Sequence, residues 1–90
     1  MPKFIIERDV PGVGTWPQDK LNEIVNKSRA AVKSTNGTVQ WVESFLTADK
    51  VFSFYIAPDQ GTLQDFIKLS PLPPGPIHRV TQVVDPTTNE

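Results

Sequence analysis

The stretch from Val39 to Pro58 constrains the fold of this chain more than any other. It holds two apolar-rich runs separated by the short polar segment 47–50. Valine, isoleucine, phenylalanine, tyrosine and tryptophan dominate both runs, and such side chains suit a pleated, half-buried surface. Pro58 cannot continue the second run, because proline donates no hydrogen bond to a neighbouring strand. The pattern predicts a β-hairpin, on which the rest of the 90-residue chain must pack.

Four further elements are expected around the hairpin. Residues 3–9 alternate so that Phe4 and Ile6 share one face, which predicts a strand. A helix should follow, with Thr15 and Gln18 as a capping box and Asn36-Gly37 as its left-handed end. A shorter helix should begin at Asp59 and end before Pro71. After a stiff proline-rich connector, residues 77–84 predict the last strand.

This order, strand-helix-strand-strand-helix-strand, predicts an α+β fold of the ferredoxin-like type in a single domain spanning residues 1–90. Its four-stranded antiparallel sheet would carry both helices on one face. The other face would expose Trp41, Phe45 and Tyr55, together with Ile5 and Val83. An exposed apolar patch of this kind is unusual in a soluble monomer. We therefore expect a homodimer that packs sheet to sheet through this face, as in a dimeric α+β barrel.

Composition excludes several classes of function. The chain has 9 basic and 10 acidic residues and a net charge of −1, so it lacks the basic surface that nucleic-acid binding requires. It has no cysteine, so neither a disulfide nor a thiolate metal site can form. The sequence shows no signal peptide and no apolar run approaching the ~18 residues of a membrane span. A cytoplasmic protein that uses no cofactor and binds no membrane is expected.

The open sheet face is also the candidate ligand site. Strand alternation is expected to gather five residues there, namely Glu7, Trp41, Glu43, Ser53 and Tyr55. Tryptophan and tyrosine can stack on a planar organic ligand, and an apolar environment raises the pKa of a carboxylic acid enough for acid–base work. The competing interpretation is a dimer core with a few satisfied polar groups.

Metal-binding residues are scarce. His78 is the only histidine and lies beside Arg79 at the start of the last expected strand. One imidazole supported by carboxylates such as Glu7 or Glu43 would make a weak site, so no metal site is predicted and His78 is only a weak candidate. In the charged run at residues 7–9, Arg8 is expected to form an ion pair with another strand.

Three segments carry a resemblance to a known family: FIIERDVPG (4–12), QWVESFLTADKVFSFYIAPD (40–59) and VVDPTTNE (83–90). They resemble a family of small bacterial proteins of unassigned function with dimeric ferredoxin-like folds, which includes a nickel-responsive, nickel-binding member. The resemblance implies this fold, a dimer and a nickel site. Where the family pattern places histidines in the second strand and second helix, however, this chain has Glu43 and Phe66, and a phenylalanine cannot ligate a metal.

Three functions follow as hypotheses. The first is a dimeric binding or sensing protein with a small-ligand pocket on the open sheet face. The second is a nickel or divalent-metal-binding protein, as the resemblance implies. The third is a small cofactor-free isomerase or monooxygenase-like enzyme in which Glu43 or Glu7 is the base. The sequence leaves open whether the protein is an enzyme.

Overall fold

The computed structural model describes residues 1–89. Its strands are β1 (Lys3–Asp9), β2 (Gln40–Leu46), β3 (Lys50–Ile56) and β4 (Ile77–Arg79), and its helices are η1 (Val13–Thr15), α1 (Gln18–Lys33) and α2 (Gln60–Ile67). The elements follow the predicted order, with the short 3-10 helix η1 added before α1. No helix in this part of the chain is long and apolar enough to cross a membrane.

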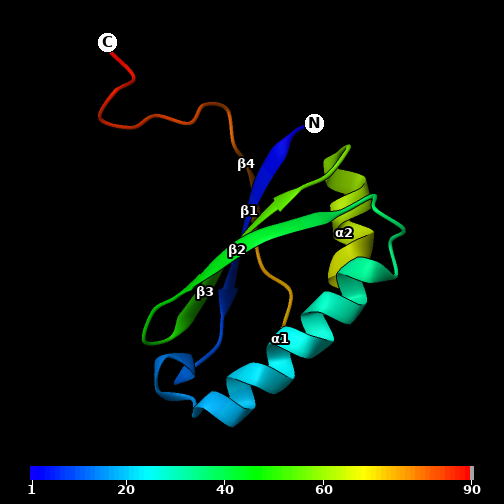
Figure 1. The fold of residues 1–90 in the computed structure, drawn as a ribbon, viewed down its shortest axis with the longest axis vertical. Helices are drawn as coiled ribbons and strands as arrows, with labels where there is room; N and C mark the ends of the chain where they lie inside the picture. The colour runs from blue at the N-terminus through cyan, green and yellow to red at the C-terminus, as the bar shows by residue number, and fades with distance from the viewer. Residues whose placement is uncertain (90) are drawn as a thin grey trace.

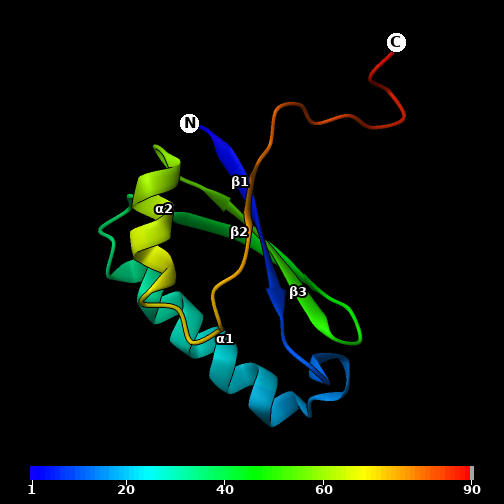
Figure 2. The same cartoon turned by 180° about the vertical axis from the view of Figure 1, so that it is seen from behind.

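The four strands form one antiparallel sheet in the order β2-β3-β1-β4. Both helices lie on the same side of this sheet, and no helix of residues 1–89 covers its other face (Figures 1 and 2). The prediction of an α+β, ferredoxin-like fold is confirmed.

The core lies between the sheet and the helices in two clusters of buried side chains. The larger cluster gathers around Phe4 and Ile6 of β1 and includes Leu63 and Phe66 of α2. The smaller cluster consists of Val10, Val13 and Val51, with Trp16 and Leu72 packed against it, and it lies near η1. The core is therefore continuous beneath α2 but divided beneath α1.

The start of α1 differs from the prediction. Its N-cap is Pro17, and no side chain caps it, so the predicted capping box is wrong. Thr15 belongs instead to η1, where its hydroxyl donates to the carbonyl of Gly12 at 2.9 Å. The end of the helical segment matches the prediction, because Asn36 and Gly37 have φ values of 54° and 84°.

The predicted cap of α2 is confirmed. The Asp59 carboxylate accepts the backbone N–H of Thr62 at 2.7 Å. This hydrogen bond stabilises the ionised form and lowers the pKa of Asp59.

β4 is shorter than the predicted strand at 77–84. It pairs with β1 over three positions, the last of which sets Arg79 opposite Phe4. Because β1 itself begins at Lys3, the residues after Val80 have no strand left to pair with. The chain runs away from the sheet there, and Val83 and Val84 are exposed (Figure 1).

Candidate functional site

The structure divides the five predicted site residues between the two faces of the sheet. Glu7 lies opposite Phe52, and Glu43 lies opposite Phe54, on the open face. The other three residues, Trp41, Ser53 and Tyr55, lie on the face that the helices cover. The predicted grouping of all five on the open face is therefore wrong.

Two local features explain this division. Both sides of β3 are apolar, and the register with β1 sets Tyr55 opposite the buried Phe4, which fixes Tyr55 and Ser53 on the helix side. In β2 a register shift between Trp41 and Glu43 places these two residues on opposite faces. Trp41 and Tyr55 consequently cannot belong to the predicted dimer face, which keeps Phe45 and Ile5.

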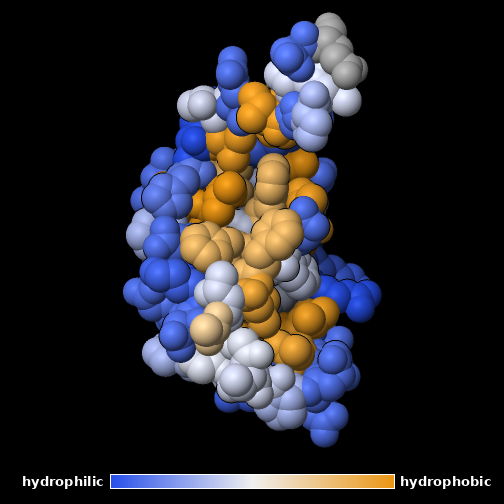
Figure 3. All heavy atoms as spheres, turned by 90° about the vertical axis from the view of Figure 1, so that its left-hand side faces the viewer, coloured by the Kyte–Doolittle hydropathy of each residue, from blue (hydrophilic) through white to orange (hydrophobic). Residues whose placement is uncertain are grey.

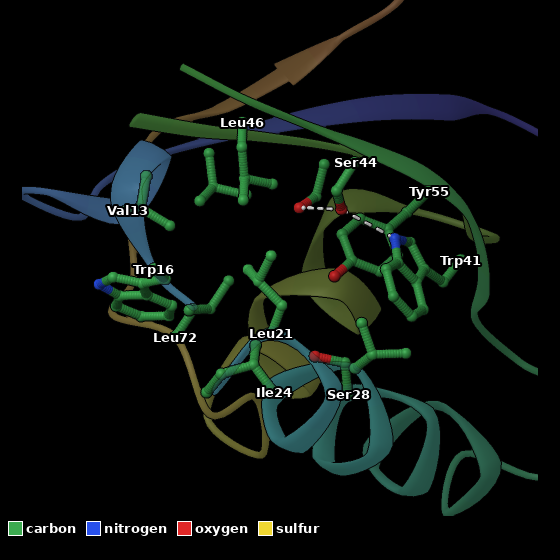
Figure 4. A pocket seen from close by; sticks show the side chains of 13 residues that line it. Val13, Trp16, Leu21, Ile24, Ser28, Trp41, Ser44, Leu46, Tyr55 and Leu72 are labelled. Carbon is green, nitrogen blue, oxygen red and sulfur yellow. Dashed lines mark hydrogen bonds between the residues drawn. The ribbon is translucent and has the colours of Figure 1, made fainter. Parts of the chain in front are cut away.

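Trp41, Ser53 and Tyr55 instead meet at a cavity of about 70 Å³ between α1 and the sheet. The cavity lies beneath the N-terminal half of α1, between the two core clusters (Figure 4). Most of its wall is apolar and comes from Val13, Trp16, Leu21, Ile24, Leu46 and Leu72. It reaches the surface, since Leu46 is 43% exposed and Val25, also in the wall, is 40% exposed.

A chain of hydrogen bonds forms the polar part of this wall. The indole N–H of Trp41 donates to Ser44 Oγ at 2.9 Å, and the hydroxyls of Ser44 and Ser53 are 2.8 Å apart. Behind them, the guanidinium of Arg8 donates to Ser53 Oγ at 2.9 Å. The charged Arg8 side chain in the core is thus connected to the cavity through the hydroxyl of Ser53.

Arg8 is fully buried and has no carboxylate partner within residues 1–89. Its other contacts are a long hydrogen bond of 3.4 Å to Ser70 Oγ and the ring of Tyr55, whose centroid lies 5.9 Å from the guanidinium carbon. Its Nε has no hydrogen-bond partner in the described residues. The predicted ion pair of Arg8 with another strand is wrong.

Two more hydroxyls face the cavity. The hydroxyl groups of Tyr55 and Ser28 point into it from the sheet and from α1 (Figure 4). Neither is hydrogen-bonded to another side chain that lines the cavity. Polar groups from the sheet and from α1 therefore converge on a mostly apolar space, which is the usual composition of a small-molecule site.

The open face carries a separate charged cluster. Lys50 Nζ lies 2.9 Å from Glu7 Oε2 and 2.7 Å from Asp9 Oδ1, and His78 Nε2 lies 3.3 Å from Glu7 Oε1. The hydrogen bonds from Lys50 and then His78 lower the pKa of Glu7. The hydrogen bonds to Asp9 and then Glu7 raise the pKa of Lys50 to about 12. Glu7 is held ionised, contrary to the raised pKa expected of a carboxyl among aromatic rings.

Apolar side chains fill the rest of the open face. Ile5, Phe52, Phe54 and Ile56 share this face and are half-buried, and Phe45 is 56% exposed. Figure 3 shows a continuous apolar band between two hydrophilic margins on the side of the molecule away from the helices.

Comparison with known proteins identifies the family. A family profile described as "Nickel responsive protein SCO4226-like" matches residues 4–80. The chain belongs to the SCO4226-like family. Among solved structures, the crystal structure of SCO4226 from Streptomyces coelicolor A3(2) is similar, with a TM-score of 0.73 and 14% sequence identity over 91% of this chain and 99% of that one. No curated protein matches the chain.

The family match confirms the resemblance to the SCO4226-like family and covers two of the three segments that carried it. The third segment, at 83–90, lies beyond the matched residues, and Glu90 lies outside the described residues. At 14% identity the similarity to SCO4226 establishes the shared fold.

Sequence reasoning missed Arg8, Ser44 and Ser28 as site residues. The strand alternation that places Phe4 and Ile6 in the core places Arg8 there too, so the signal for its burial was present. Nothing in the sequence predicts Ser44, because the register shift in β2 decides where it points. Ser28 lies four residues after Ile24 on α1, so helical periodicity places both on one face of the helix.

The charged cluster gives a pH-dependent prediction. In Lys50→Met, the pKa of Glu7 should rise toward its ordinary value, because the hydrogen bond and the positive charge that lower it are gone. A depressed carboxyl pKa stabilises the fold above the pKa of the unfolded chain, and this contribution is lost as the pH falls through the folded pKa. The stability advantage of the wild type should therefore be present at neutral pH and shrink in acid.

The measurement is an NMR titration of the glutamate carboxyl carbons together with urea unfolding at several pH values. Lys27→Met is the control, because it removes the exposed pair between Lys27 and Glu23 and should leave the pKa of Glu7 unchanged. An unaltered Glu7 titration in Lys50→Met would contradict this account of the cluster.

Proposed function

We propose that this protein binds a small organic molecule in the cavity between α1 and the sheet. The observation that carries the proposal is the cavity itself, about 70 Å³ in volume and open to the surface in a 90-residue domain. Protein cores are close-packed and have few voids larger than a water molecule, so a void between two core clusters is a candidate ligand site. Its apolar wall and converging hydroxyl groups support a ligand with one polar and one apolar part.

The binding proposal has more support than the enzyme hypothesis. Both carboxylates considered as bases, Glu7 and Glu43, lie on the open face and away from the cavity. Glu7 is paired with Lys50, which lowers its pKa, whereas a general base works best with a pKa near the operating pH. Glu43 is exposed to solvent.

The cavity proposal can be tested with three four-carbon probes of similar size, namely butyrate, butyramide and 1-butanol. At least one should shift the methyl NMR signals of Leu21, Ile24 and Leu46, because these side chains line the cavity. Ser28→Met should weaken that binding by at least about tenfold, since a longer side chain at this position fills the space.

Ala30→Met serves as the matched control, because Ala30 is exposed on the same helix and does not line the cavity. It should bind the probes as the wild type does. If none of the three probes perturbs the lining methyl groups, the cavity is not a ligand site and the proposal fails.

We further propose a homodimer through the open face. Phe45 is 56% exposed there, beside half-buried phenylalanine and isoleucine side chains. A contiguous apolar band rimmed by charges is typical of a protein–protein interface. A second copy is the simplest partner, because a two-fold axis would bring this face against itself and cover both bands at once.

Phe54→Glu should convert the dimer to a monomer at micromolar concentration, because an unpaired charge in the core of an interface is strongly unfavourable. Sedimentation velocity measures this directly. Leu69→Glu is the control, since Leu69 is 58% exposed at the end of α2 on the helix side and should leave the dimer intact. A wild-type protein that sediments as a monomer would refute the dimer.

Nickel is the second candidate ligand, because the family is described as nickel-responsive. The side chains that come nearest to a site are His78 and Glu7, 3.3 Å apart. Within residues 1–89 no three histidine, aspartate or glutamate side chains gather where they could hold a metal ion, and Lys50 already binds the other Glu7 oxygen. One imidazole with one carboxylate does not fit the ligand set that tight nickel binding requires.

We therefore predict that the apo protein binds nickel only weakly and with little selectivity among divalent ions. Titration calorimetry should give nearly the same weak isotherm for the wild type and for His78→Ala. A stoichiometric, submicromolar site that disappears in His78→Ala would contradict this prediction and support nickel as the ligand.

A further inference from the structure

Arg8 places a positive charge in the core, and the described residues supply no matching negative charge. The side chain is fully buried, and among residues 1–89 its guanidinium meets two serine hydroxyls and the ring of Tyr55. A buried charge is normally paired, because removing it from water is unfavourable unless an opposite charge compensates. The fold therefore maintains a positive potential behind the polar wall of the cavity.

The hydrogen bonds of that wall leave one hydrogen without an acceptor. Arg8 and Trp41 can only donate, so Ser53 Oγ and Ser44 Oγ each accept one of their N–H groups. The two serines have two hydroxyl hydrogens, and one of these forms the bond between them. The other hydrogen is left over, on a residue that lines the cavity whichever way the bond runs.

A ligand that supplies a hydrogen-bond acceptor and a negative charge would satisfy both the free hydroxyl hydrogen and the charge of Arg8. We propose that the ligand is a small organic acid whose carboxylate accepts the free hydroxyl hydrogen of Ser44 or Ser53 and neutralises the charge of Arg8. The hydroxyls of Tyr55 and Ser28 are further donors, and the apolar wall at Leu21 and Ile24 receives the hydrocarbon part. This inference rests on the proposed function, because it names the chemical class that the same cavity takes.

The volume and the wall favour a short carboxylic acid over an inorganic anion. A cavity needs only ~10–15 Å³ to hold one water molecule, so a cavity of about 70 Å³ holds a carboxylate with a short hydrocarbon tail, and longer tails can extend through the open side. An inorganic anion would leave the apolar wall without a partner.

The decisive comparison is between butyrate and butyramide, which differ in charge but hardly in shape. Butyrate should bind at least about tenfold more tightly at neutral pH, because hydrogen bonds that involve charged groups are roughly twice as strong as neutral ones. Chloride at the same concentration should not reproduce the methyl shifts. The readout is the dissociation constant from NMR titration of the lining methyl groups.

Two variants assign this preference to Arg8. Arg8→Met should bind butyrate and butyramide equally, and it should remain folded, because an apolar side chain of similar length replaces an unpaired buried charge. If Arg8→Met does not fold, Ser53→Ala gives the test, since it removes the hydroxyl that links Arg8 to the cavity and should also reduce the preference. Ser34→Ala, at the end of α1 and away from the cavity, should keep the full preference.

The outcomes separate this inference from the proposed function. If butyrate and butyramide bind the wild type equally, the cavity is a ligand site but the organic-acid class is wrong. If chloride competes as well as butyrate does, the site takes any small anion and the inference also fails. If no probe binds, both proposals fail. A butyrate preference that persists in Arg8→Met and in Ser53→Ala would show that Arg8 is not its source.

Discussion

The structure depends on the ladder between β1 and β3, in which seven consecutive residue pairs run from Lys3 opposite Ile56 to Asp9 opposite Lys50. Because side chains alternate along a strand, this one register decides what every residue of both strands faces. It directs Phe4, Ile6 and Arg8 toward the helices and directs Glu7 and Asp9 outward to Lys50. A slip by one residue would exchange the core for the charged cluster.

The same register explains why a buried cation can persist without a carboxylate. The fold gains the burial of Phe4 and Ile6, which precede Arg8 on the same face of β1, and a strand paired without a bulge cannot turn one inward residue outward. Leaving the guanidinium unpaired therefore lowers the stability of the fold. Natural proteins commonly accept such a loss of stability at sites where a ligand binds.

How far the sequence predicts this structure varies along the chain. Element order, the hairpin and the Asp59 cap follow from local chemistry, and so does the fold class. Local chemistry does not predict which face of β3 points into the core. Phe54 and Tyr55 are both suitable core residues, and only the pairing with β1 determines which of them is buried there. The shift at Trp41 and the gap beneath α1 depend on how distant segments fit together, so the cavity could not be predicted although three of its residues were singled out.

The hydrogen-bonded chain at the cavity joins segments of very different separation along the sequence. Ser44 and Ser53 are 9 residues apart across one hairpin, whereas Arg8 and Ser53 are 45 residues apart. Closing a longer loop has the larger entropic penalty, so local contacts form sooner than distant ones during folding. We therefore expect the two hydroxyls to meet before β1 pairs with β3, so that the guanidinium loses its water only when acceptors for it are already in place.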